Sequence, residues 1–206
     1  MFNMINLEKA VKAFERKGYT VKVFDTKEDA AEYLDMAIDG KIVGFGDSQT
    51  LLDMELFRKL REHNVVFDPY HTSGNKEFVE VAKKTLTTDV FLTSVNAFAE
   101  TGELVNIDGT GNRVAGSLFG HKKVYFVMGV NKGEETLEKA MWRAQNIAAP
   151  QNAKRKGLNT PCAVKGDKCY DCNGPDCICN AIMVHRRKMR NTDDMEIVII
   201  KENLGM

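Results

Sequence analysis

Residues 89–113 read Asp-Val-Phe-Leu-Thr-Ser-Val-Asn-Ala-Phe-Ala-Glu-Thr-Gly-Glu-Leu-Val-Asn-Ile-Asp-Gly-Thr-Gly-Asn-Arg, and they place a buried strand directly before a polar segment. The first part, Val90 to Val95, has the length and the β-branched content of a strand covered on both faces. The second part spaces carboxylates, amides and one arginine with Gly102, Gly109 and Gly111, which suits a backbone that bends sharply beside a polar ligand. A hairpin with a polar tip, followed by a loop, is the alternative. We favour a ligand site.

Strands and helices alternate on both sides of this stretch. Strands are predicted at residues 19–24, 41–43, 65–67, 90–95, 124–130, 182–184 and 195–200, and helices at 7–17, 26–38, 51–63, 76–86 and 137–150. The alternation predicts an α/β fold with a mainly parallel sheet and helices on both faces. We expect one domain over residues 1–206, with an N-terminal helix within residues 1–18 and a Cys-rich excursion at 160–180.

A second glycine-containing loop follows the strand that ends at Val43. It contains Gly44, Gly46, Asp47, Ser48 and Thr50, and a predicted helix comes directly after it. Backbone N–H groups and hydroxyls in such a loop favour an anion, whereas the Asp47 carboxylate would oppose one. Ligand contact and a simple tight turn both stay open. Ligands of parallel sheets bind at the carboxyl ends of the strands, so we expect this loop and the loop after Val95 to share one site.

The charge balance and the hydropathy limit the classes of function. Lys+Arg and Asp+Glu both total 29, so the formal net charge is zero. Non-specific nucleic-acid binding is therefore not expected, because such domains carry a basic excess. No apolar run reaches the length of a membrane span, and the first residues lack the order of a signal peptide. We expect a cytoplasmic protein.

All five cysteines lie between Cys162 and Cys179, separated in turn by six, two, four and one residues. Cys169 and Cys172 form a C-x-x-C pair, which commonly presents two thiolates to one metal ion. Cys162, with Cys179 or Cys177, would complete four thiolate ligands for zinc or for an iron–sulfur cluster. The spacing leaves these two alternatives open. It also leaves open a loop of free thiols and a disulfide under oxidation.

Six motifs resemble the lactate-utilisation (LUD) domain family. They are Val-Gly-Phe-Gly-Asp-Ser-Gln-Thr (43–50), Asp-Val-Phe-Leu-Thr-Ser-Val-Asn-Ala (89–97), Gly-Glu-Leu-Val-Asn-Ile-Asp-Gly-Thr-Gly-Asn-Arg (102–113), Gly-Val-Asn-Lys (129–132), Asn-Ile-Ala-Ala-Pro-Gln-Asn-Ala-Lys-Arg (146–155) and Cys-Tyr-Asp-Cys-Asn-Gly-Pro-Asp-Cys-Ile-Cys-Asn (169–180). The resemblance covers nearly the whole chain. It implies the sugar-phosphate isomerase/CoA-transferase-like α/β fold. It also implies a role in bacterial oxidation of lactate to pyruvate, alongside iron–sulfur partner proteins.

The resemblance further implies where ligands bind. In the family Arg commonly stands at the position of Cys177, so the implied metal ligands are Cys162, Cys169, Cys172 and Cys179. Enzymes of the related fold use a glutamate beside a glycine turn as nucleophile, or carboxylates as acid and base. By that comparison Glu100 and Glu103 are the catalytic candidates. The predicted residues around a small anionic ligand are Gly44, Gly46, Asp47, Ser48, Thr50, Asn96, Asp108, Gly109, Gly111, Asn112 and Arg113.

Two other functions compete with the role in lactate oxidation. One is a stand-alone enzyme that acts on a phosphorylated or CoA-linked small acid, as the glycine loops and glutamates suggest. The other is a non-catalytic module in which the cysteines hold a structural zinc. A homodimer is the default expectation for the assembly.

Overall fold

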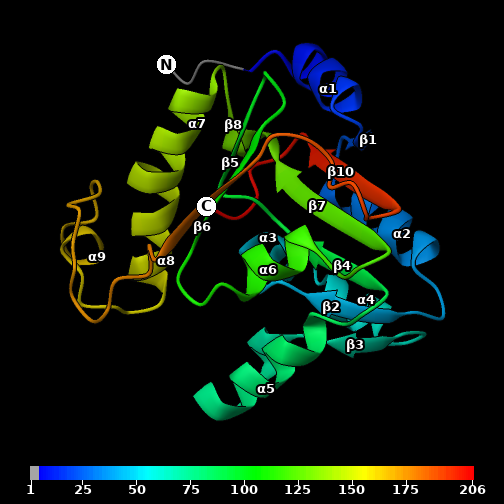
Figure 1. Cartoon of the computed structure of the whole chain (residues 1–206), viewed down its shortest axis with the longest axis horizontal. Helices are drawn as coiled ribbons and strands as arrows, with labels where there is room; N and C mark the ends of the chain where they lie inside the picture. Colours follow the sequence, from blue (N-terminus) through cyan, green and yellow to red (C-terminus); the bar gives the residue numbers. More distant parts are fainter. Residues whose placement is uncertain (1–4) are drawn as a thin grey trace.

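Six strands form a central parallel sheet, as Figure 1 shows for the computed structural model, which describes residues 5–206. The order across the sheet is β1 (Thr20–Phe24), β10 (Asp194–Ile200), β7 (Lys123–Gly129), β4 (Val90–Thr93), β2 (Ile42–Phe45) and β3 (Val65–Phe67). Every neighbouring pair is parallel. The predicted α/β class with its parallel sheet is therefore confirmed. The last strand of the chain, β10, lies inside the sheet between β1 and β7.

Helices cover both faces of this sheet, because consecutive residues of the central strands are apolar and point to opposite faces. In β10, Val198 and Ile200 face one core, while Ile197 and Ile199 face the other. The first face carries α2 (Lys27–Ala37), α3 (Gln49–Asp53) and α4 (Leu56–Leu60), and the second carries α1 (Leu7–Arg16), α5 (Asn75–Thr85) and α6 (Asn112–Leu118). Of the helix expected within residues 1–18, residues 1–4 lie outside the described part of the chain.

A second sheet of four strands was not predicted. It consists of β8 (Gly133–Glu134), β5 (Ala97–Ala99), β6 (Leu104–Asp108) and β9 (Ala181–His185). Strands β5 and β6 form an antiparallel hairpin, and Gly102 turns the chain between them at φ +88°. The hairpin considered for residues 89–113 therefore exists. The open end and the turn of the hairpin lie at opposite ends of its strands. Asn96 and Asp108 are therefore at the open end, and Glu100 and Glu103 are at the turn.

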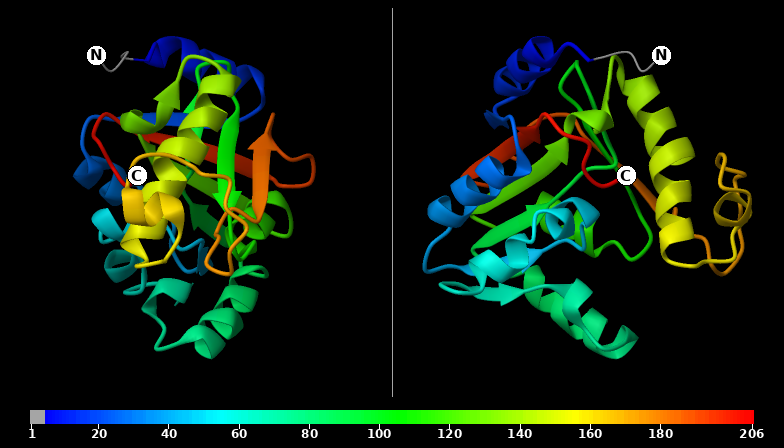
Figure 2. Two further views of the ribbon diagram at one scale, coloured as in Figure 1. Left: turned by 90° about the vertical axis from the view of Figure 1, so that its left-hand side faces the viewer. Right: turned by 180° about the vertical axis from the view of Figure 1, so that it is seen from behind.

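One long helix covers the second sheet. It runs through α7 (Leu137–Arg143), a π-helical turn (Ala144–Ala148) and α8 (Ala149–Arg155), beyond the end predicted near Pro150. Pro150 cannot donate a backbone hydrogen bond, and it stands at the start of α8, directly after the π-helical turn. Figures 1 and 2 show α9 (Pro161–Lys165) and the Cys-rich loop on the outer side of this helix.

The single helix predicted over residues 51–63 is wrong, because the chain forms α3 and α4 with a break between them. Glu55 adopts a left-handed backbone at φ +51°. Met54 and Leu56 are both buried in the same core. A continuous helix would point these two side chains to opposite sides, and the break lets both reach the sheet. Short 3-10 turns at Pro69–His71 and Val130–Lys132 complete the connections.

Within residues 5–206, no helix combines the length and the apolar character that a membrane span requires.

Candidate functional site

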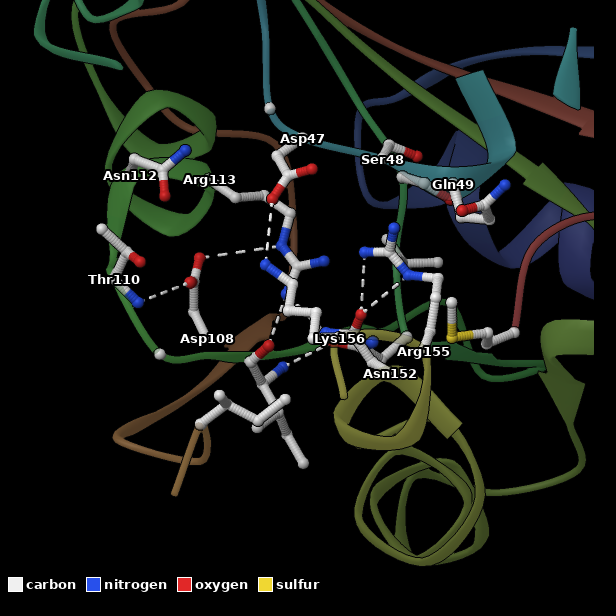
Figure 3. A pocket seen from close by; sticks show the side chains of 18 of the residues that line it. Asp47, Ser48, Gln49, Asp108, Thr110, Asn112, Arg113, Asn152, Arg155 and Lys156 are labelled. Atoms are coloured by element: carbon white, nitrogen blue, oxygen red, sulfur yellow. Dashed lines mark hydrogen bonds and ion pairs between the residues drawn. The ribbon is translucent and has the colours of Figure 1, made fainter. Parts of the chain in front are cut away.

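A polar pocket lies at the carboxyl ends of β2 and β4, and Figure 3 shows the side chains that point into it. The loop after β2 contributes Gly46, Asp47, Ser48 and Gln49, and the loop after β4 contributes Ser94, Val95 and Asn96. The pocket is partly open to solvent and has a volume of about 90 Å³. The expectation that these two loops share one edge of the sheet agrees with this arrangement, because β2 and β4 are direct neighbours.

Three further segments close the pocket. The end of β6 and the start of α6 contribute Ile107, Asp108, Gly109, Thr110, Asn112 and Arg113. The helix α8 and the residue after it contribute Asn152, Arg155 and Lys156. Three residues from other segments, Lys132, Ile178 and Met206, complete the lining. The predicted residues Gly46, Asp47, Ser48, Asn96, Asp108, Gly109, Asn112 and Arg113 therefore meet in one place.

Three of the predicted ligand residues lie elsewhere. Gly44 is within β2, where a side chain would collide with Thr85 and Thr88, so this glycine serves the contact with α5. Thr50 is buried behind the pocket. Gly111 adopts a left-handed backbone at φ +89° as the N-cap of α6.

The Asp108 carboxylate already occupies the backbone donors that were expected to bind an anion. Its oxygens accept hydrogen bonds from the backbone N–H groups of Thr110 (3.2 Å), Gly111 (3.1 Å) and Val114 (3.1 Å). An incoming anion therefore meets side-chain cations rather than the start of α6. Asp108 also lies 3.7 Å from Nε of Arg113.

Arg113 is a partly buried cation on one wall of the pocket. Its Nη2 donates to Asn96 Oδ1 at 3.4 Å and to the carbonyl oxygen of Ile107. Nε is buried, and no residue of the described chain accepts a hydrogen bond from it. The opposite wall carries Arg155, whose Nη2 donates to Asn152 Oδ1 at 3.0 Å within the same helix. The bonds of Arg113 hold its guanidinium group in place before any ligand binds, whereas the exposed Arg155 is bonded only within its own helix.

Asp47 does not oppose an anion as strongly as its sequence position suggests. Lys156 Nζ lies 3.4 Å from Asp47 Oδ2, across the mouth of the pocket. Asp47 itself has a left-handed backbone at φ +49°, and the next residue, Ser48, caps α3 by accepting from Leu51 N. The loop after β2 is thus a turn stabilised by its own bonds, and its carboxylate is paired.

Lys132 is a site residue that the predictions missed. It is 3% exposed, and its Nζ donates to Thr50 Oγ1 at 2.8 Å and to Ser94 Oγ at 2.9 Å. Burial lowers the pKa of Lys132 to about 7, and the charges of Arg143 and Arg113 act in the same direction. Lys132, Asn152 and Arg155 all belong to motifs that carried the family resemblance, which is the signal that would have found them.

Glu100 and Glu103 are not part of the pocket, because both lie at the turn end of the β5–β6 hairpin beside α1. Glu100 accepts from Asn6 N at 2.7 Å and from Lys9 Nζ at 3.0 Å. Glu103 pairs with Lys17 Nζ. Burial raises the pKa of Glu103, but the hydrogen bonds from Lys17 and Thr101 outweigh it and leave the pKa below its ordinary value. The structure shows these glutamates as anchors of the first helix.

The five cysteines are free thiols, with Cys162 in α9 and the other four in the loop that follows. Cys169 Sγ accepts from Asp171 N at 3.3 Å, as in the knuckle expected for a C-x-x-C pair. Burial raises the pKa of Cys179 to about 12, and the nearby thiols of the other four cysteines add to this shift. The thiols suit a soft metal chemically. Within residues 5–206, however, no three His, Cys, Asp or Glu side chains converge closely enough to bind one ion.

The Cys-rich loop touches the pocket. Ile178, between Cys177 and Cys179, lines the pocket and lies against Gly109, where a Cβ would be 3.1 Å from the Ile178 backbone. Asn180 Nδ2 donates to the carbonyl oxygen of Gly109 at 2.9 Å. Cys177 and Cys179 therefore lie next to residues that line the polar pocket.

Comparison with known families agrees with this architecture. The model of the LUD domain matches residues 7–200. The chain belongs to the LUD domain family. The predicted resemblance is thereby confirmed. This LUD domain is also similar to the crystal structure of a DUF162 family protein from Deinococcus radiodurans, with a TM-score of 0.51 and 10% sequence identity, over 94% of this chain and 95% of that chain. At this identity the similarity concerns the fold alone. No curated protein matches the chain.

Proposed function

We propose that this LUD domain binds a small carboxylate anion in the pocket at the carboxyl ends of β2 and β4. The proposal rests on one observation. Three charged side chains, Arg113, Arg155 and Lys156, and the partly protonated amine of Lys132 line the pocket, against two carboxylate side chains. Both carboxylates are already engaged, Asp47 by Lys156 and Asp108 by backbone N–H groups and Arg113. The uncompensated positive charge favours an anionic ligand, and guanidinium groups suit the planar carboxylate.

Titration calorimetry tests the anion site directly. L-Lactate, pyruvate and inorganic phosphate are titrated separately into the full chain. Binding of one or both of the organic acids, and its loss in the Arg113→Gln variant, supports the proposal. Absence of heat with all three probes, or binding that is equal in the variant, contradicts it.

The role we propose for this site is in bacterial oxidation of lactate to pyruvate, together with iron–sulfur partner proteins. Membership of the LUD family supports this role, and so does the position of Ile178, which brings the cysteines next to the anion pocket. A deletion strain should lose growth on lactate and regain it with the wild-type gene, but not with a gene carrying Arg113→Gln. Normal growth of the deletion strain, with no functional paralogue present, would overturn the role.

A larger ligand is the second candidate, and a second hollow favours it. This hollow, of about 500 Å³, shares Asp47, Thr110, Arg155 and Lys156 with the pocket and adds the rings of Tyr70 and Phe78. A phosphorylated or CoA-linked acid would place its acid in the pocket and the rest of the molecule along these rings. In that case Tyr70→Ala should weaken binding of an acyl-CoA and leave binding of lactate unchanged. Equal effects on both ligands would contradict the larger ligand.

A further inference from the structure

Lys132 is almost fully buried, which is unusual for a lysine. It follows the central strand β7, and its amine lies between the loops after β2 and β4. Two of its three N–H donors meet the hydroxyls of Thr50 and Ser94, while the side chain lines the pocket. In the described part of the chain, no carboxylate forms an ion pair with this amine. A buried ammonium group without such a partner is costly, so a purely structural position would favour an apolar residue.

The surroundings favour the neutral amine, which has a free electron pair. Burial, followed by the charges of Arg143 and Arg113, outweighs the opposing charge of Asp53 and lowers the pKa of Lys132 to about 7, so that a large share of the amine is neutral at neutral pH. Lysines in enzymes gain nucleophilicity in this way, by desolvation and by a neighbouring cation. Arg143 is held in place by the carbonyl oxygens of Asn96 (2.6 Å) and Asn131 (3.1 Å).

The other side chains of the pocket determine which carbonyl compound reaches this amine. Arg113 and Arg155 lie on the walls and suit a carboxylate, as argued above. A volume of about 90 Å³ admits a ligand of a few heavy atoms. A short 2-oxo acid carries both groups, a carboxylate for the arginines and a carbonyl carbon for the amine, and it is small enough for this volume.

We propose that Lys132 forms an imine with the carbonyl carbon of a short 2-oxo acid held in this pocket. The inference rests on the proposed anion site and adds a covalent step to it. The lone pair of Nζ forms a bond to the carbonyl carbon while the carbonyl π pair moves to oxygen. A proton then passes from nitrogen to that oxygen, which gives a carbinolamine. Loss of the hydroxyl group, with the remaining amine proton, releases one water and leaves the C=N bond.

Thr50 and Ser94 are positioning residues in this step. Their hydroxyls lie within 2.9 Å of Nζ and can accept a proton from nitrogen or donate one to the departing oxygen. The two hydroxyls are 3.2 Å apart, so a proton can also pass between them. No oxidant or reductant is consumed, because imine formation changes no oxidation state.

Reductive trapping tests the proposal. The full chain is incubated with pyruvate at neutral pH, treated with sodium cyanoborohydride, digested and examined by mass spectrometry. The expected product is an N-(1-carboxyethyl) group on Lys132, near one per chain. Lys83→Arg should be labelled like the wild type, because Lys83 is exposed and lies outside the pocket. Lys132→Arg and Lys132→Met should lose the label, and a cooperative thermal transition checks that each variant is folded. The labelling of Lys132 in the wild type tests the proposal even if neither Lys132 variant folds.

The outcomes separate this step from anion binding. Pyruvate that binds in calorimetry but leaves Lys132 unlabelled overturns the imine and leaves the anion site intact. Label spread evenly over exposed lysines also overturns it. Absence of both binding and label contradicts the proposed function together with the imine.

Discussion

Lys132 Nζ lies 2.9 Å from Ser94 Oγ, although 38 residues separate them in the chain. The bond joins the carboxyl ends of β7 and β4, which are neighbours in the central sheet. The same amine reaches Thr50 after β2, so one side chain ties together three adjacent strand ends. The floor of the pocket is thus fixed by hydrogen bonds across the sheet, and the arginines are arranged above a rigid base.

Arg113→Gln should weaken anion binding by tenfold to a hundredfold, since a lost charge-assisted hydrogen bond costs about 1.5–3 kcal/mol. The glutamine can still donate to a neighbouring carbonyl, which preserves part of the local structure. Calorimetry with the best-binding acid measures the effect. Arg187→Gln is the matched control, because Arg187 is exposed and outside the pocket. An equal loss in both variants would mean that general charge, and not this pocket, binds the anion.

The sequence predicted pocket residues that follow two neighbouring parallel strands. Gly46 and Asn96 follow strands that proved to be neighbours, so the edge rule for parallel sheets brought them together correctly. Lys132 was not predicted, because a single lysine after an apolar strand has the same local pattern as a surface residue. Arg155 was missed for a different reason. It reaches the pocket only because the helix continues past Pro150, and that depends on a π-helical turn.

Glu100 and Glu103 were predicted as site residues, but they lie outside the pocket. Glu100 and Glu103 are close in sequence to Asn96 and Asp108, and they flank a glycine as a catalytic carboxylate would. The hairpin separates them, because residues at its turn and at its open end lie at opposite ends of the strands. Sequence proximity therefore suggested one site where the structure has two different environments.

Glu100→Ala should lower the free energy of unfolding by about 1–3 kcal/mol, because it removes the hydrogen bonds that the buried Glu100 carboxylate accepts from Asn6 N and Lys9 Nζ. Anion binding should not change, since the residue lies at the far end of the hairpin. Urea unfolding and calorimetry measure the two effects. Glu8→Ala is the control and should leave stability nearly unchanged, because its pair with Lys12 is exposed. Loss of anion binding in Glu100→Ala, with stability retained, would restore Glu100 as a site residue.

The cysteine hypothesis predicts a bound metal on Cys162, Cys169, Cys172 and Cys179, and anaerobic purification with elemental analysis tests it. A visible absorption band indicates an iron–sulfur cluster, whereas zinc is colourless. Cys172→Ser should release the metal, and Cys177→Ser should retain it, because Cys177 lies outside the predicted ligand set. Metal lost equally from both variants would contradict that set. Metal-free wild-type protein would contradict the hypothesis itself.

Lys132 also predicts how stability depends on pH. The pKa of this amine is about 7 in the folded chain and near 10.4 when unfolded, so between these values the unfolded chain binds more protons. The free energy of unfolding of the wild type, relative to Lys132→Met, should therefore rise with pH across this window, by up to about 1.4 kcal/mol per pH unit. Below pH 7 both states are protonated, and the difference becomes constant. Urea unfolding at a series of pH values measures it, with Lys156→Met as the matched control from the same pocket. A difference that stays flat from pH 7 to pH 10 would show that the buried amine keeps its proton, and the nucleophile proposed for the imine would then be absent at neutral pH.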